Sequence, residues 1–406
     1  MKTGWAIRDL GGICAFENGD RGENYPSKSA QTTSGVPFIN AGHLTDSGID
    51  FSDMNYIPRE RFDLLGNGKI RKGDVLFCLR GSLGKFSSVG DLSEGAIASS
   101  LIIIRPSNEL SNEFLLAYLQ SDLCAEMIHK FKNGAAQPNL SAASLKKFLI
   151  PIPPLAEQRR IVGVLGEAFA GLSAARAHAE KNLQNTRALF ESQLHSVFTQ
   201  HGPGWVESKL GDLAEFKNGL NFTRQSKGQR LRIVGVGDFQ DNAVVPIEAL
   251  QSVTINGKLS DDYLIRCNDI LAVRSNGSRD LVGRCMLVPE MEEKTSYSGF
   301  VIRIRFDAAA ISPRFLLRYL KSSGTRAQLT RDGGGANISN INQAKLSELP
   351  ISLPSFREQE HVADRFDAIA TETQRLENLY RQKIAALAAL KKSLLHRALN
   401  GELLAQ

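Results

Sequence analysis

The strongest constraint on the fold is an internal repeat, because the second half of the chain restates the first about 200 residues later. Each half begins with a Trp and continues with Leu-Gly, Phe and Asn-Gly at the same spacing. The identical residues are Trp5, Leu10, Gly11, Phe16, Asn18 and Gly19, and then Trp205, Leu210, Gly211, Phe216, Asn218 and Gly219. Such agreement without a gap indicates a duplicated domain. We therefore expect two similar units related by a pseudo-two-fold repeat.

Other segments recur in the same order. GDVLFCLRGSLGK (Gly73 to Lys85) matches NDILAVRSNGS (Asn268 to Ser278), and FLLAYLQS matches FLLRYLKS. Near the end of each half, we pair Asn139 and Ser141 with Asn337 and Ser339, and Leu145 with Leu346. GAAQPNLS stands where the second half has GGGANIS, and this three-residue difference in spacing makes the match between the two loops inexact.

Within each unit the hydrophobic pattern is mixed. The β-branched runs at Ser99 to Pro106 and Ser298 to Phe306 predict strands, and the many glycines predict turns between them. FLLAYLQSDLCAEMIHKF, with Leu115, Leu119, Leu123 and Met127 on one stripe, predicts a single helix. The fold class is therefore α+β.

Two long segments follow the proline clusters and have a different character. Phe356 to Asn400 contains neither Gly nor Pro, and Ser355 with Glu358 forms a capping-box pattern before it. Its apolar residues follow heptad spacing, interrupted at Lys383: Val362, Phe366, Ile369, Thr373, Leu376, Tyr380, Leu387, Leu390 and Leu394. Leu155 to Phe198 repeats the theme with three glycines. Each segment predicts a helix of roughly 65 Å.

A helix of that length needs a partner for its apolar seam. The order of the parts favours antiparallel coiled-coil pairing of the two helices within one chain. Pairing with a second copy of the chain, or a solvated helix, remains an alternative. The expected domains are residues 1–153 and 201–353 as globular units, with 154–200 and 354–406 as the long helices.

Composition limits the function. The net charge is +6, with 20 Lys and Arg against 16 Asp and Glu in residues 201–353, a mild indication of a polyanionic partner. The cysteines are scattered and form no C-x-x-C pair, so neither a disulfide framework nor a zinc site is expected: Cys14, Cys78, Cys124, Cys267 and Cys285. No apolar run reaches the roughly 20 residues of a membrane span, and the start lacks a signal-peptide core. We expect a cytoplasmic protein without a membrane partner.

Catalytic motifs are not found. The sequence contains no N-P-P-Y-type or D-P-P-Y-type motif of an amino-methyltransferase, and GSLGKF lacks the first glycine of a phosphate-binding loop. The seven histidines show no metal-ligand spacing. We therefore expect no catalytic residue and no metal site on this chain.

Several motifs, in order and in duplicate, resemble the specificity subunit of type I restriction-modification systems over essentially the whole chain. The motifs are IPIPPLAEQRRIV (Ile150 to Val162), ISLPSFREQEHV (Ile351 to Val362), LRGSLGK, VRSNGSRDLVGR and LYRQKIAALAALKKSLLHRALNGEL. The resemblance implies two target recognition domains, each reading half of a split site on double-stranded DNA. It also implies two long helices that bind two modification (methyltransferase) subunits, joined by restriction (translocase and endonuclease) subunits. S-adenosylmethionine would then belong to the modification subunit, ATP and Mg²⁺ to the restriction subunit, and no cofactor to this chain.

Candidate DNA-binding residues lie in glycine-flanked loops that follow predicted strands. They are chosen by type, since Arg favours guanine edges and Asn or Gln favours adenine edges. They are Arg80, Ser82 and Lys85 in the first unit, and Arg274, Ser275, Asn276 and Arg284 in the second. Gln137, Asn139 and Asn337 are weaker candidates, since Asn near a helix start is often a cap. The alternative is that these loops are ordinary solvated turns.

Three functions compete at this point. A DNA-recognition scaffold binds a specific site with its partner subunits, an enzyme requires a catalytic constellation, and a coiled-coil adaptor has no affinity for DNA. For the scaffold we expect an asymmetric, bipartite target with half-sites about 10 base pairs apart, so that both units face the same side of the duplex.

Overall fold

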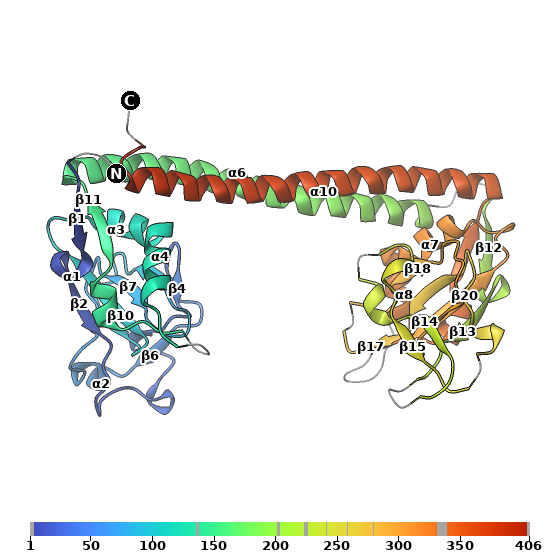
Figure 1. The fold of residues 1–406 in the computed structure, drawn as a ribbon, viewed down its shortest axis with the longest axis horizontal. Coiled ribbons are helices and arrows are strands. Elements are labelled where there is room, and N and C mark those ends of the chain that lie inside the picture. The colour runs from blue at the N-terminus through green and yellow to red at the C-terminus, as the bar shows by residue number, and fades with distance from the viewer. Residues whose placement is uncertain are drawn as a thin grey trace. The chain divides into compact units, whose positions relative to one another are not determined.

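The structure is a computed structural model that describes residues 4–134, 138–200, 204–222, 226–240, 242–257, 259–278, 280–330 and 339–403. The chain forms two compact units. The first unit comprises Met1–Ala179 with Gln382–Gln406, and the second comprises Glu180–Arg381. Each unit contains a globular α+β part and half of each of two long helices (Figure 1).

The globular part of the first unit is built on a four-stranded antiparallel sheet in the order β2-β10-β7-β8, with a three-stranded sheet, β6-β3-β9, beside it. A two-stranded sheet pairs β1 with β11. The elements are β1 (Ala6–Asp9), α1 (Leu10–Ile13), β2 (Cys14–Asn18), β3 (Val36–Ile39), β4 (Leu44–Thr45), β5 (Gly48–Ile49), β6 (Asn55–Ile57), α2 (Arg59–Asp63), β7 (Val75–Cys78), β8 (Phe86–Ser88), β9 (Ala96–Ile97), β10 (Leu101–Pro106), α3 (Asn112–Leu119), α4 (Asp122–Phe131), α5 (Ala142–Lys146) and β11 (Leu149–Ile152).

The inner strands of the central sheet, β7 and β10, are buried on both faces, which explains their continuous apolar runs. On β7, Val75 and Phe77 face a core formed with the helices, while Leu76 and Cys78 face the core shared with the three-stranded sheet. All four side chains are fully buried. The period of two along the strand therefore places the sheet between two apolar layers.

The second unit repeats this topology. Its sheets run β13-β20-β16-β18 and β15-β14-β19, and β12 pairs with β22 as β1 pairs with β11. The elements are β12 (Val206–Lys209), β13 (Ala214–Asn218), β14 (Arg230–Val234), β15 (Ser252–Thr254), β16 (Ile270–Val273), β17 (Ser275–Asn276), β18 (Cys285–Leu287), β19 (Thr295–Tyr297), β20 (Val301–Phe306), α7 (Pro313–Lys321), α8 (Ser323–Thr330), β21 (Ser339–Asn340), α9 (Gln343–Ser347) and β22 (Pro350–Leu353). The predicted α+β repeat is confirmed.

The repeated Leu-Gly and Asn-Gly pairs mark close backbone approaches. A Cβ at Gly19 would lie 2.6 Å from the carbonyl oxygen of Ala98, and a Cβ at Gly219 would overlap the carbonyl oxygen of Ser298. A Cβ at Gly11 would lie 3.1 Å from the Cβ of Lys146 in α5. These spacings recur because the same backbones meet in both units.

One predicted helix is in fact two. The sequence predicted a continuous helix through FLLAYLQSDLCAEMIHKF, but α3 ends at Leu119 and α4 begins at Asp122. Ser121 caps α4, since its Oγ accepts the backbone N–H of Cys124 at 3.4 Å. A serine able to cap competes with helix continuation, and here the cap prevails.

The two long helices are α6 (Leu155–Thr199) and α10 (Phe356–Leu399). Within each unit they lie side by side (Figure 1). In the second unit, Arg187 pairs with Glu377 at 3.0 Å and the ring of Phe198 stacks on that of Phe366 at 6.0 Å, so the helices run antiparallel there. No helix in the described part of the chain is long and apolar enough to cross a membrane.

The apolar seam of α10 differs from the prediction near its end. Leu390 is 48% exposed, and Lys383 is also exposed. In the first unit the buried positions are Leu395, Ala398 and Leu399, which join the core together with Ile161 and Leu165 of α6. Beyond the interruption at Lys383, the buried stripe therefore runs on a neighbouring face of the helix.

A buried glutamine fixes the start of each long helix. The Nε2 of Gln158 donates to the carbonyl oxygens of Pro153 and Glu109 at 2.9 and 2.8 Å, and its Oε1 accepts the N–H of Ser111 at 2.9 Å. Gln359 makes the equivalent contacts with Pro354 and with the Ser312 N–H. The preceding glutamates, Glu157 and Glu358, accept the indole N–H of Trp5 and Trp205 at 3.2 and 3.3 Å. The Glu-Gln pairs of the sequence thus tie each helix to its sheet and to the cap of α3 or α7.

Candidate nucleic-acid interface

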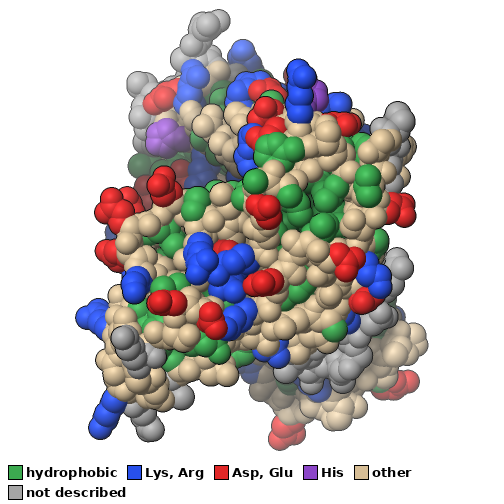
Figure 2. Space-filling model, turned by 90° about the vertical axis from the view of Figure 1, so that its right-hand side faces the viewer, with side chains coloured by type: hydrophobic (Ala, Val, Ile, Leu, Met, Phe, Trp, Pro, Cys, Tyr) green, Lys and Arg blue, Asp and Glu red, His purple; other side chains and the backbone are tan. Residues whose placement is uncertain are grey.

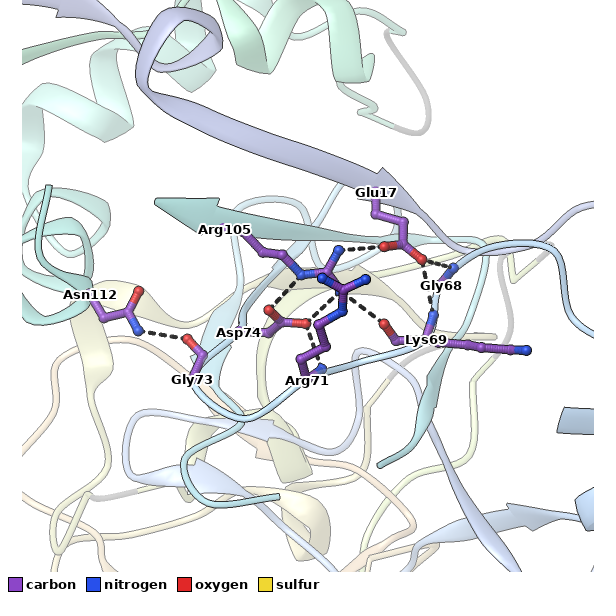
Figure 3. A network of polar contacts seen from close by, with 8 residues as sticks. All are labelled: Glu17, Gly68, Lys69, Arg71, Gly73, Asp74, Arg105 and Asn112. Carbon is purple, nitrogen blue, oxygen red and sulfur yellow. Dashed lines mark hydrogen bonds and ion pairs between the residues drawn. The ribbon is translucent and has the colours of Figure 1, made fainter. Parts of the chain in front are cut away.

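An arginine–aspartate pair fixes the strand that leads into each candidate loop. In the first unit, Arg105 on β10 donates through Nε and Nη2 to the carboxylate of Asp74 at 2.8 and 2.9 Å (Figure 3). Asp74 immediately precedes β7 and also accepts the backbone N–H of Arg71 at 2.8 Å. Bidentate pairing of this kind fixes both distance and orientation. It therefore holds β7, and the loop after it, against β10.

Glu17 on β2 adds a third member to this network. It accepts a hydrogen bond from Nη1 of Arg105 and the backbone N–H groups of Gly68 and Lys69, at 2.7 and 3.2 Å (Figure 3). Burial by itself raises the pKa of Glu17, but the hydrogen bonds from Arg105 and Gly68 outweigh it, and the pKa lies below its ordinary value. The carboxylate is therefore held ionised.

The second unit carries the same pair with different surroundings. Arg305 on β20 donates to Asp269 at 2.7 and 2.6 Å, and Asp269 accepts the Arg266 N–H at 2.7 Å. The residue equivalent to Glu17 is Lys217, which pairs with Asp262 at 3.2 Å. Motif spacing did not reveal these pairs, although the sequence carries a signal for them, since an Asp stands just before both strands.

In the first unit, Arg80, Ser82 and Lys85 lie in the loop after β7 with exposed side chains. Nη2 of Arg80 donates to the carbonyl oxygen of Ser99 at 3.3 Å, and Nζ of Lys85 donates to that of Ala41 at 2.9 Å. Asn139, also exposed, forms a backbone bridge with Arg80. The fold therefore brings together two candidate segments that are distant in sequence.

The second unit builds the same junction. Ser275 and Asn276 form β17, which pairs with β21, and both side chains are half-buried. Arg274 donates through Nη1 to the carbonyl oxygen of Gly299 at 3.3 Å. Arg284 donates to the carbonyl oxygens of Asp280, at 2.9 Å, and Gln240. As in the first unit, cationic side chains lie against the ends of neighbouring strands.

The backbone contacts correct the residue matching made from sequence. The backbone N–H of Leu140 donates to the carbonyl oxygen of Leu79 at 2.9 Å, and that of Ile341 donates to the carbonyl oxygen of Arg274 at 2.8 Å. The position equivalent to Asn139 is therefore Asn340 and not Asn337. Matching letters across the loops misplaces the register by three residues. Gln137 and Asn337 lie outside the described residues.

Two further correspondences follow from the same kind of contact. The N–H of Cys78 donates to the carbonyl oxygen of Lys85 at 2.7 Å, and that of Val273 donates to the carbonyl oxygen of Arg284 at 2.9 Å. Lys85 and Arg284 are therefore equivalent. Ser275, and not Arg274, is equivalent to Arg80, since each forms the bridge to its Asn. The loop that returns to the cation is thus longer in the second unit.

Some candidate atoms are already used in local turns. Oδ1 of Asn276 accepts the N–H of Ser278 at 2.7 Å, as expected for a solvated turn. Within the described ranges, its Nδ2 has no hydrogen-bond partner and remains available as a donor.

Charge is mixed on one side of the second unit. Figure 2 shows the side on which β12, β13 and β20 lie, where Lys and Arg side chains stand among Asp and Glu. On β12, Lys209 pairs with Glu348 at 2.7 Å. A phosphate backbone gains little from a face on which cations are already paired.

The cysteines do not form a reactive centre. All five are free; four are buried and Cys267 is exposed. Burial raises the pKa of Cys14, Cys124 and Cys285 to about 12 in each case, so these thiols stay protonated at neutral pH. Among the described residues no group of three or more His, Cys, Asp and Glu side chains could hold a metal ion.

Comparison with known proteins gives consistent matches. A family model described as "Type I restriction modification DNA specificity domain" matches residues 2–176 and 203–386. The type I restriction enzyme StySPI specificity subunit of Salmonella potsdam is 25% identical, covering 100% of this chain and 90% of that protein. The EcoKI specificity subunit of Escherichia coli (strain K12) is 24% identical over the same shares.

Solved structures share the fold. A chain from a study of complex assembly and conformational transition of the type I R-M system superposes with a TM-score of 0.81 at 21% identity, covering 99% of both chains. The crystal structure of the HsdS subunit from Thermoanaerobacter tengcongensis gives a TM-score of 0.61 at 20% identity, covering 99% of this chain and 98% of that one.

Proposed function

The chain belongs to the family of type I restriction enzyme specificity subunits, and from this premise we propose that each unit reads one half of a bipartite DNA target. The relatives are the recognition component of their systems and not the catalytic subunits, so the chain is itself a specificity subunit. The proposal concerns how it performs recognition.

One observation supports two half-sites above all others. The same backbone junction, Arg80 with Asn139 and Ser275 with Asn340, occurs once in each unit. Phosphates and base edges are recognised by side chains of these kinds, Arg, Ser and Asn. The scaffold is repeated while the side chains differ, so the two halves of the target should differ in sequence.

We further propose that the long helices bind two modification subunits, which the restriction subunits then join. Counted from Gln158 and Gln359, Leu189 on α6 and Leu390 on α10 occupy equivalent positions, and they are 63% and 48% exposed. Single exposed apolar side chains are common on protein surfaces, and here it is their repetition at equivalent positions that supports a repeated contact. One such leucine in each unit suits two copies of one partner.

A groove in the second unit supports the same proposal. It has a volume of about 490 Å³ and lies between α6 and α10. Its apolar lining includes Leu189, Phe190, Ile369, Leu376 and Tyr380.

In this assembly S-adenosylmethionine belongs to the modification subunit, and ATP and Mg²⁺ to the restriction subunit.

The test is methylome sequencing of the host, followed by binding assays on the target it identifies. With a co-expressed modification subunit, we expect specific binding to a split, asymmetric site and loss of binding when either half is scrambled. Native mass spectrometry should show two modification subunits for each chain. A continuous or palindromic target would contradict the two-reader proposal, and absence of DNA affinity would favour a coiled-coil adaptor.

A further inference from the structure

Phe300 is an unusual residue on the surface of the second unit. Its side chain is 61% exposed, whereas the next two residues, Val301 and Ile302, are fully buried in β20. A phenylalanine gains stability from burial, so at this exposure the ring of Phe300 gains little from the fold itself.

The position of Phe300 is fixed by Arg274. The carbonyl oxygen of Phe300 accepts the backbone N–H of Arg274 at 2.8 Å, and the preceding carbonyl, of Gly299, accepts Nη1 of the same arginine at 3.3 Å. A Cβ at Gly299 would overlap Oδ1 of Asn221, so this amide lies directly against the same turn. Phe300 therefore stands beside an arginine and an amide suited to base edges.

The first unit shows that the scaffold does not require an aromatic residue here. The carbonyl oxygen of Ser100 accepts the N–H of Leu79 at 2.8 Å, just as that of Phe300 accepts the N–H of Arg274, and each residue immediately precedes its strand, β10 or β20. The backbone arrangement is thus kept with a serine. The difference lies in what the side chain presents to a ligand.

We propose that Phe300 packs against the C5-methyl group of a thymine in the half-site read by the second unit. This rests on the proposed function, since it requires that Arg274 and its neighbours face DNA. In the major groove the only apolar group on the edge of a base pair is the thymine methyl, while Arg and Asn read the purine edges. An exposed phenyl ring beside an arginine and an amide matches such a mixed edge.

The test uses the full chain with its modification subunit and the methylome-defined target. Each thymine of the second half-site is replaced in turn by deoxyuridine, which removes the methyl and keeps the hydrogen-bonding pattern. We expect one replacement to weaken binding about threefold to fivefold, as for the loss of one buried methyl. Phe300→Ser, which installs the residue of the first unit, should bind the thymine and uracil targets equally.

A matched control separates this effect from general loss of an exposed ring. Phe51, in the first unit, is 48% exposed, and Phe51→Ser should keep the full sensitivity to uracil in the second half-site. Replacements in the first half-site should affect the wild type and Phe300→Ser alike.

Several results would overturn the proposal. They are indifference of the wild type to every uracil replacement, sensitivity retained by Phe300→Ser, or a second half-site without thymine. Failure of Phe300→Ser to bind the modification subunit would assign the ring to a protein contact. With 2-aminopurine placed in the second half-site, a rise in fluorescence on binding the wild type but not Phe300→Ser would indicate that the ring inserts between bases instead. If the wild type showed no bipartite target at all, the proposed function would fail instead.

Discussion

The two units hold their central sheets with the same contacts and differ in the side chains around them. Asp74 with Arg105 and Asp269 with Arg305 occupy equivalent places with equivalent geometry. Around these pairs, Glu17 becomes Lys217. At the candidate interface, Lys85 becomes Arg284 and Ser100 becomes Phe300. The two units therefore share the contacts that position the strands and differ in the side chains that the candidate interface presents to a ligand.

The largest effect we expect comes from removing one carboxylate of the repeated pair. Asp269→Ala leaves Arg305 largely buried without its partner, which should destabilise the second unit by about 3 to 5 kcal/mol. Asp74→Ala should cost less, because Arg105 keeps its pairing with Glu17. Amide hydrogen exchange, which reports on each unit separately, measures both effects.

The control for this comparison is Arg59→Ala, which breaks an exposed pair with Glu94. Little change in exchange is expected there, since exposed pairs contribute little. Equal destabilisation by Asp74→Ala and Asp269→Ala would show that Glu17 does not share in holding Arg105.

The repeated Asn-Gly pairs give the next largest effect. Gly19→Ala and Gly219→Ala each force a methyl group onto a strand carbonyl, and we expect a loss of about 1 to 3 kcal/mol in the unit concerned. Gly166→Ala on α6 is the matched control, because nothing lies within 4 Å of its Cβ. It should stabilise the helix by roughly 0.5 to 1 kcal/mol. A stabilising Gly219→Ala would mean that the backbones do not meet there.

Sequence patterns predicted the repeat and the long helices closely. The expected helices, Leu155 to Phe198 and Phe356 to Asn400, end within one residue of α6 and α10. Gly401 ends α10 with a φ of 76°, a conformation that glycine adopts without strain. These features depend on local sequence, or on residue identities that recur in both halves, and so they can be predicted without a structure.

What could not be predicted depends on contacts between distant strands. Asp74 stands just before its strand, as Asp269 does, but nothing local in the sequence pairs it with Arg105, and only the sheet brings the two together. The equivalence of Asn139 with Asn340 is a matter of backbone pairing, which similar letters in two loops misplaced. The exposure of Phe300 likewise depends on the turn before β20. The apolar residues that follow it in the sequence predict a buried side chain instead.

The candidate readers offer a test of the comparison at the level of DNA. Arg274→Ala with Asn276→Ala should relax discrimination in one half-site only, by roughly 1 to 3 kcal/mol for each base-reading side chain removed, and Arg80→Ala should do so in the other. Methylation rates on targets with single substitutions in either half measure this.

If the Arg274 and Asn276 variant kept both halves specified at the normal rate, these loops would not be the readers. The segments around His43 and Asp238 would then be the next candidates. Lys85 already donates to Ala41, two residues before His43, so the first of these segments adjoins the present candidates.

The smallest expected effect concerns pH and separates the units at one position. The pKa of Glu17 is lowered in the folded chain, so its carboxylate contributes stability above the unfolded pKa and loses that contribution as the pH falls through the folded value. Lys217 stands at the equivalent place in the second unit and brings no carboxylate of its own, and its partner Asp262 is largely exposed, so this pair adds little stability. Glu17→Gln should therefore flatten the acid limb of stability in the first unit alone, at a cost of less than about 1 kcal/mol near neutral pH. Hydrogen exchange of β2 and β13 amides, compared between about pH 7 and pH 4, measures the slope of each unit. A first unit whose slope did not change in the variant would show that Arg105 is satisfied by Asp74 alone, and the difference between Glu17 and Lys217 would then have no bearing on stability.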